Sequence, residues 1–120
     1  GGKALIQCIT IADDKFKQYA KQADMIRTFI FPGGMLASEK LLLREFKKAG
    51  LAVKDIYRFG KDYSKTLHSW LINFDANRCE IENLGFDNSF INMWRFYLAS
   101  CSAAFATGRT NVIQIELQHS

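Results

Sequence analysis

Two patterns of hydrophobic and polar residues alternate along the chain, and together they predict an α/β fold. Three runs are rich in aliphatic and β-branched residues, as strands are: Lys3–Ile11, Leu51–Phe59 and Asn111–Gln118. Between these runs, apolar residues recur at intervals of three and four, which is typical of helices that bury one face. Four stretches show this helical spacing: Lys15–Thr28, Glu39–Ala49, Asp62–Asn77 and Asn88–Thr107. The pattern predicts a three-stranded sheet packed with about four helices.

Polar residues and glycines mark the ends of these elements. Ser38, Asp62 and Asp87 stand at the starts of helical runs, where a short polar side chain caps free N–H groups. Gly50 and Gly108 follow helical runs, where glycine commonly ends a helix. Residues 79–85 are expected to form a short irregular link or the tail of the preceding helix.

The first strand, Lys3–Ile11, has few polar residues and reads as a strand buried on both faces. Its short helical connection to Leu51–Phe59 implies a parallel, right-handed crossover. Three strands are few for an open α/β sheet, so a neighbouring strand is expected to be missing. We therefore predict an exposed edge at Lys3–Ile11, and either marginal stability or self-association through this strand.

The stretch Phe31-Pro32-Gly33-Gly34 is the sharpest break in the pattern and contains the only proline. Proline fixes its own φ and disfavours helix at the residue before it, and the two glycines permit positive φ. Phe31 is thus presented from a turn. Two interpretations remain open, a helix stop with a hydrophobic anchor and a device that presents Phe31 to a site. A nucleotide-binding loop is not expected, because no strand precedes the glycines.

Composition narrows the classes of protein. The 120 residues are 48% hydrophobic and 23% charged, which is typical of one globular domain. No apolar run is long enough to span a membrane, and no signal peptide is visible. The chain begins at a strand-like run without an initiator Met, which indicates a piece of a longer protein.

The charge is positive and uneven along the chain. Residues 1–60 carry 11 Lys and Arg against 6 Asp and Glu, which suits an anionic partner such as phospholipid or nucleic acid. Nucleic acid is disfavoured because exposed aromatic residues do not interleave with the basic ones. Cys8, Cys79 and Cys101 are widely spaced and lack metal-binding spacing, so we expect reduced thiols in a cytosolic protein and no metal site.

Four stretches together resemble a known family: IFPGGML at 30–36, GLAVKDIYRFGKDYSKTLHSW at 50–70, LGFD at 84–87 and MWRFYLASCSAAFATGRTNVIQIEL at 93–117. They are similar to the C-terminal part of the cyclopropane-fatty-acid synthases, which include the mycolic-acid cyclopropane synthases. The resemblance implies an S-adenosylmethionine-dependent methyltransferase acting on the cis double bond of acyl chains, usually in phospholipids.

The resemblance also implies the fold and its missing half. Residues 1–120 would form the C-terminal part of a Rossmann-like methyltransferase domain, with the last strand antiparallel and between the other two. The glycine-rich turn and the acidic residue that bind the cofactor belong to the first half of such folds. We therefore expect no cofactor-binding residue in this chain, and no turnover by the chain alone.

Several site residues follow from the resemblance. The family uses a bicarbonate-like anion as a base, and three of the family positions that hold this anion fall within this chain. They match the Tyr63 hydroxyl, the backbone of Ile9, and Gln7, which stands in place of a histidine. Glutamine donates a hydrogen bond but cannot become cationic, so a methyl or methylene product competes with the cyclopropane. Phe31, with Pro32, Gly33 and Gly34, matches an aromatic near the reacting end of the lipid, where a ring face favours a cation.

Plainer interpretations stay open for each residue. Tyr63 can also be a core tyrosine with its hydroxyl at the surface. Gln7 can be a strand-end residue that pairs with the neighbouring backbone, and Phe31 can be a hydrophobic plug. The whole chain also fits a non-catalytic lipid-binding or partner-binding module. The expected partners are unsaturated phospholipid acyl chains and the missing N-terminal half, and the expected location is cytoplasmic, at the inner face of the membrane.

Overall fold

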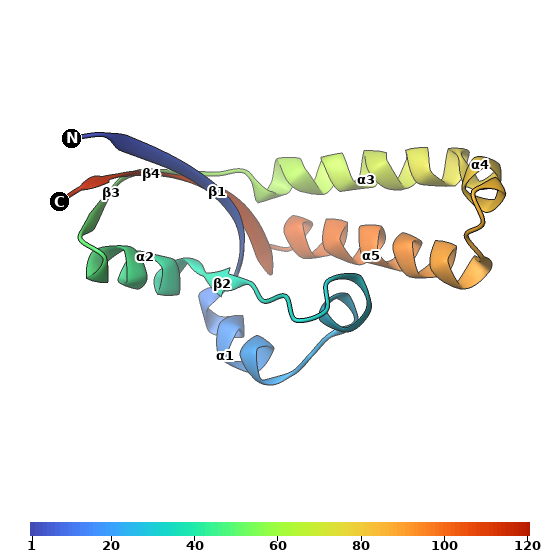
Figure 1. The fold of residues 1–120 in the computed structure, drawn as a ribbon, viewed down its shortest axis with the longest axis horizontal. Helices are drawn as coiled ribbons and strands as arrows, with labels where there is room; N and C mark the ends of the chain where they lie inside the picture. Colours follow the sequence, from blue (N-terminus) through green and yellow to red (C-terminus); the bar gives the residue numbers. More distant parts are fainter.

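The computed structural model describes all residues, 1–120, and contains one four-stranded mixed sheet in the order β2-β1-β4-β3 (Figure 1). Its strands are β1 (Lys3–Ile11), β2 (Ala37–Ser38), β3 (Leu51–Arg58) and β4 (Thr110–His119). Strand β4 is antiparallel to both β1 and β3 and lies between them. The α/β class is therefore confirmed, together with the central, antiparallel position of the last strand.

The sheet has four strands where the sequence predicts three. The additional strand, β2, pairs in parallel with the end of β1, through Thr10 opposite Ala37 and Ile11 opposite Ser38. Two residues are too few to leave a period-two pattern, which is why the sequence does not reveal this strand.

Strand β4 contributes to the core on both faces of the sheet, because successive side chains of a strand point to opposite sides. On one face, Ile113, Ile115 and Leu117 are fully buried, with Leu42 and Phe46 of helix α2 (Glu39–Lys48) packed against them. On the other face, Val112 packs with three residues of α3 (Gly60–Ala76) and α5 (Asn88–Ala106): Leu67, Leu98 and Phe105.

Two of the predicted helix caps are present. The Ser38 hydroxyl accepts the backbone N–H of Leu41 at 3.1 Å at the start of α2. The Asp87 carboxylate accepts the N–H of Phe90 at 2.9 Å at the start of α5.

The predicted cap at Asp62 is wrong, because α3 begins two residues earlier, at Gly60. The Gly60 N–H donates to Oδ1 of Asn111 on β4 at 2.8 Å. A Cβ at this position would lie 2.4 Å from the same oxygen, so a larger residue would have to displace the Asn111 side chain. The link after α3 is also more regular than an open loop, because Arg78–Asn83 forms the short helix α4.

The predicted helix Lys15–Thr28 is divided into two parts. Helix α1 covers Asp13–Lys21, its C-cap Gln22 is extended, and a π-helical turn, η1, covers Ile26–Ile30. Asp24 restarts the helical turn: its carboxylate accepts the N–H of Arg27 at 2.8 Å, and its carbonyl accepts the Thr28 hydroxyl at 2.7 Å. A polar residue that caps from inside an amphipathic run is easily misread as part of the helix face.

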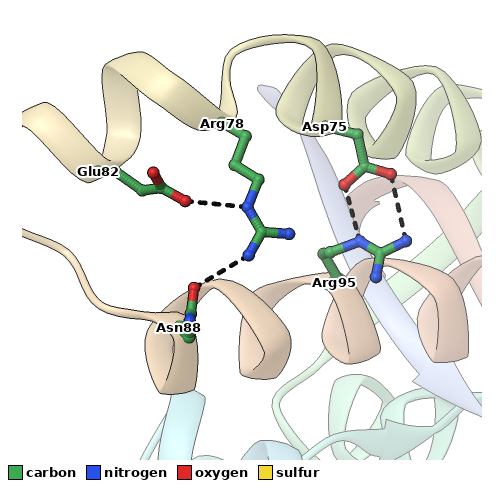
Figure 2. A network of polar contacts seen from close by, with 5 residues as sticks. All are labelled: Asp75, Arg78, Glu82, Asn88 and Arg95. Carbon is green, nitrogen blue, oxygen red and sulfur yellow. Dashed lines mark hydrogen bonds and ion pairs between the residues drawn. The ribbon is translucent and has the colours of Figure 1, made fainter.

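Helices α3 and α5 form a hairpin that projects from the sheet, with α4 at its tip (Figure 1). The radius of gyration is 17.0 Å, compared with about 14 Å for a compact domain of this length. Figure 2 shows polar contacts near the tip, between Arg95 and Asp75 and from Arg78 to both Glu82 and Asn88. The Nε of Arg95 donates to Oδ1 of Asp75 at 2.7 Å. None of the helices is long and apolar enough to cross a bilayer.

Candidate functional site

A large apolar cavity lies where the end of β1 meets η1, the following turn, α3 and α5. Its volume is about 890 Å³, and 16 of its 23 lining residues are hydrophobic. Ligand pockets commonly have volumes of roughly 300–1,000 Å³ and mostly apolar walls with a few polar groups. The cavity is therefore suited to a largely hydrophobic ligand.

The structure brings four of the predicted site residues together on this cavity. Ile9 comes from β1, Phe31 and Gly34 from the turn after η1, and Tyr63 from the first turn of α3. These segments are distant in sequence, so the juxtaposition is produced by the fold.

The other three predicted residues do not line the cavity. Gln7 is exposed, and its Oε1 accepts a hydrogen bond from Nε2 of Gln114, its cross-strand neighbour, at 2.9 Å. Pro32 and Gly33 are exposed residues of the turn; Gly33 has a φ of 80°. In that turn the Gly34 N–H bonds the Phe31 carbonyl at 2.9 Å.

Phe31 lies on the wall of the cavity rather than in the core. Its side chain is 55% exposed, and its ring meets Tyr97 of α5 edge-on, with centroids 6.0 Å apart. The turn thus places an aromatic ring between the cavity and the surface, which favours its interpretation as a presenting device.

Tyr63 is held by two other aromatic rings. Its ring is edge-on to Phe105 at 4.9 Å and to Trp70 at 5.9 Å. Burial raises the pKa of Tyr63, and the neighbouring Cys101 adds to the effect. The phenol therefore stays neutral near pH 7 and can donate a hydrogen bond to an anion without bringing a charge.

Tyr97 and Cys101 line the same cavity. Burial raises the pKa of Tyr97 and raises the pKa of the Cys101 thiol to about 11. Tyr63, Tyr97 and Cys101 thus all remain protonated at neutral pH. Tyr97 and Cys101 lie one helical turn apart on α5. Sequence periodicity cannot distinguish a residue of the core from a residue of a cavity wall.

Arg27 also lines the cavity, although the sequence pattern did not indicate it as a site residue. Its side chain is only 12% exposed, and its guanidinium carbon lies 4.0 Å from the centroid of the Tyr19 ring. Arg27, Asp24 and Tyr19 all line the cavity. Prediction of one continuous helix placed Arg27 on an ordinary amphipathic face, and the break at Gln22 turns it inward.

The mixed sheet with a central antiparallel last strand and a cavity at the strand ends defines the class of Rossmann-like methyltransferase folds. The family model described as mycolic acid cyclopropane synthetase matches residues 1–115. The chain therefore belongs to the mycolic acid cyclopropane synthetase family.

Individual relatives agree with this assignment. The chain is 33% identical over 115 residues to tuberculostearic acid methyltransferase UfaA1 of Mycobacterium tuberculosis, covering 95% of this chain and 27% of that protein. It is 33% identical over 92 residues to a probable fatty acid methyltransferase of Pseudomonas putida, covering 77% of this chain and 23% of the relative. The chain thus spans about a quarter of each relative's length.

Solved structures show the same likeness. The mycolic acid cyclopropane synthase CmaA1, in complex with SAH and CTAB, superimposes with a TM-score of 0.86 at 26% identity, over 98% of this chain and 44% of that one. The cyclopropane synthase MmaA2 from Mycobacterium tuberculosis superimposes with a TM-score of 0.85 at 21% identity, over 97% and 44% of the two chains.

The residues that follow β1 differ from the usual cofactor-binding turn of Rossmann-like folds. Strand β1 leads into Ala12 and Asp13 rather than into a glycine-rich turn. The carboxylate on the cavity wall, Asp24, is already engaged with the backbone N–H of Arg27.

Proposed function

We propose that this chain is the acyl-binding part of an S-adenosylmethionine-dependent methyltransferase that modifies double bonds of unsaturated phospholipid acyl chains. The observation that carries the proposal is the 890 Å³ apolar cavity, which joins Ile9, Phe31, Gly34 and Tyr63. The cofactor would be held by residues outside this chain, so the chain alone is inactive.

The polar groups of the cavity support a role beside a reacting acyl chain. Loss of a proton after methylation needs a base, and a bicarbonate-like anion would accept hydrogen bonds from the neutral Tyr63 and Cys101 groups. Hydrogen bonds beside a mostly apolar wall are stronger than hydrogen bonds in water. The predicted role of Gln7 requires its side chain to leave Gln114, to which it is bonded here.

The surroundings of the cavity support docking at a membrane. Phe29, Phe31 and Met35 are 62%, 55% and 55% exposed around the turn. Exposed lysines of α1 precede this turn in sequence, including Lys17 and Lys21. Apolar rings combined with basic residues favour binding to an anionic lipid surface, which agrees with a location at the inner face of the membrane.

The test is methyl transfer by the intact protein, supplied with S-adenosylmethionine and an unsaturated phospholipid. We expect the acyl mass to rise by one methylene unit, and we expect Tyr63→Phe to slow this conversion at least about tenfold by removing a donor. Tyr57→Phe is the matched control, since Tyr57 is exposed on β3 and does not line the cavity. Full activity of Tyr63→Phe removes Tyr63 from the mechanism, and an unchanged acyl mass contradicts the proposed function.

The second candidate, a non-catalytic lipid-binding module, is favoured by the same exposed turn. It predicts that the 120-residue chain binds anionic vesicles in a salt-sensitive way and that the intact protein leaves the acyl mass unchanged.

A further inference from the structure

The guanidinium of Arg27 has unused hydrogen-bonding capacity at the cavity wall. One of its N–H groups donates to the Tyr19 carbonyl, while the buried Nε has no hydrogen-bond partner. Nothing in the proposed methyl-transfer chemistry requires this positive charge.

Asp24 does not satisfy the guanidinium. Its Oδ1 lies 3.9 Å from Nε of Arg27, beyond hydrogen-bond distance, and the same oxygen accepts the backbone N–H of Arg27 at 2.8 Å. The Asp24 side chain is also 46% exposed, so water screens its charge. Arg27 lines the cavity, and its side chain donates only one hydrogen bond, to Tyr19, so guanidinium N–H groups remain for a ligand.

A buried arginine on an apolar wall needs a compensating anion. Arginine stays protonated at any physiological pH, and burying an incompletely paired charge is unfavourable. The charged lining residues are Arg27, Arg109 and Asp24, which gives the cavity a net positive charge. Arg109 is exposed, so water weakens its interaction with a ligand more than that of Arg27, whose side chain is 12% exposed.

We propose that Arg27 binds the anionic head group of an acyl-chain ligand, which is the phosphate in a phospholipid and the carboxylate in oleate, so that the cavity selects acidic amphiphiles over neutral ones. The anionic group accepts hydrogen bonds from Arg27, and the hydrocarbon chain lies against the apolar lining, which includes Ile9, Phe31 and Tyr97. This inference rests on the proposed use of the cavity as an acyl site, and it names the residue that recognises the head of the ligand.

The test compares three ligands with the same hydrocarbon chain, oleate, oleyl alcohol and oleylamine, by tryptophan fluorescence titration of the intact protein. We expect oleate to bind roughly tenfold more tightly than the alcohol, with the amine weakest. Arg27→Gln is expected to reduce oleate affinity to that of the alcohol and leave alcohol binding unchanged. Arg27→Met, which keeps an apolar stem over Tyr19, provides a second neutral variant with the same expectation.

Two controls isolate the position of the charge. Arg44→Gln removes an exposed charge from α2, and Arg109→Gln removes the exposed charge of the cavity lining; both are expected to keep the preference for oleate. Loss of the preference in Arg109→Gln, or its persistence in the two Arg27 variants, overturns the assignment.

The remaining outcomes separate this inference from the proposed function. Equal binding of all three ligands by the unmodified protein refutes the role of Arg27 and leaves the acyl site intact. Failure of all three to bind refutes the acyl site itself. If added bicarbonate raises the affinity for oleyl alcohol to that for oleate, Arg27 serves a free anion and the assignment to the acyl head is wrong.

Discussion

Burial beside the cavity changes the acidity of the Cys101 thiol. Burial raises its pKa from 9.0 to about 11. The thiol is therefore a protonated donor at neutral pH and a poor nucleophile, because the thiolate is the reactive form.

This pKa shift makes a prediction for stability against pH. Above pH 9 the unfolded chain loses the Cys101 proton while the folded chain keeps it, so the free energy of unfolding falls as the pH rises from 9 towards 11. Urea unfolding across this range is expected to show a smaller fall in Cys101→Ser. Cys79→Ser is the control, because Cys79 is exposed. Identical pH profiles for the original chain and Cys101→Ser contradict the burial of the thiol.

At the scale of elements, local features were sufficient to predict much of the fold. These features are the helical spacing of α2, α3 and α5, the caps at Ser38 and Asp87, and the alternation of β4. The start of α3 was not predictable, because it depends on a contact between Gly60 and Asn111, which are far apart in sequence. Likewise, the family resemblance predicts Tyr63 and Phe31 as site residues. Arg27 is not predictable from the sequence, because its position depends on the break in the helix at Gln22. Local patterns predict elements, and tertiary contacts decide which faces become a site.

In the α3–α5 hairpin, we expect buried packing to contribute more to the free energy of unfolding than the exposed ion pair. Leu98 is 5% exposed and packs against α3, so Leu98→Ala is expected to cost about 2–5 kcal/mol in the free energy of unfolding. Arg95→Ala is expected to cost less than about 1 kcal/mol, because Arg95 and Asp75 are both largely exposed. Urea denaturation measures both, and a larger cost for Arg95→Ala contradicts this account of the hairpin.

For the whole molecule, the outer edge of β1 is the most consequential feature. The prediction that Lys3–Ile11 is buried on both faces is wrong, because Leu5, Ile6 and Ile9 are 69%, 38% and 37% exposed. Only Thr10 and Ile11 pair with β2 on this edge. An unpaired, apolar strand edge is a template for pairing with another chain.

We therefore expect the 120-residue chain to self-associate in sedimentation velocity. Leu5→Lys is expected to shift it towards monomer, because a charge on an edge strand opposes pairing. Leu84→Lys is the control, since Leu84 is 76% exposed in the distant hairpin. A strictly monomeric original chain contradicts the prediction.

The central claim is that the cavity holds an acyl chain, and tryptophan quenching by a stearate brominated at its two middle carbons tests it most directly. Trp70 contacts Tyr63 and Trp94 contacts Tyr97, so a chain in the cavity brings bromine near both indoles. Ala104 lines the cavity, whereas Ala106 lies on the same helix outside it. We predict saturable quenching in the intact protein that is lost in Ala104→Phe and kept in Ala106→Phe. Absence of quenching, or equal quenching in the two variants, contradicts the claim.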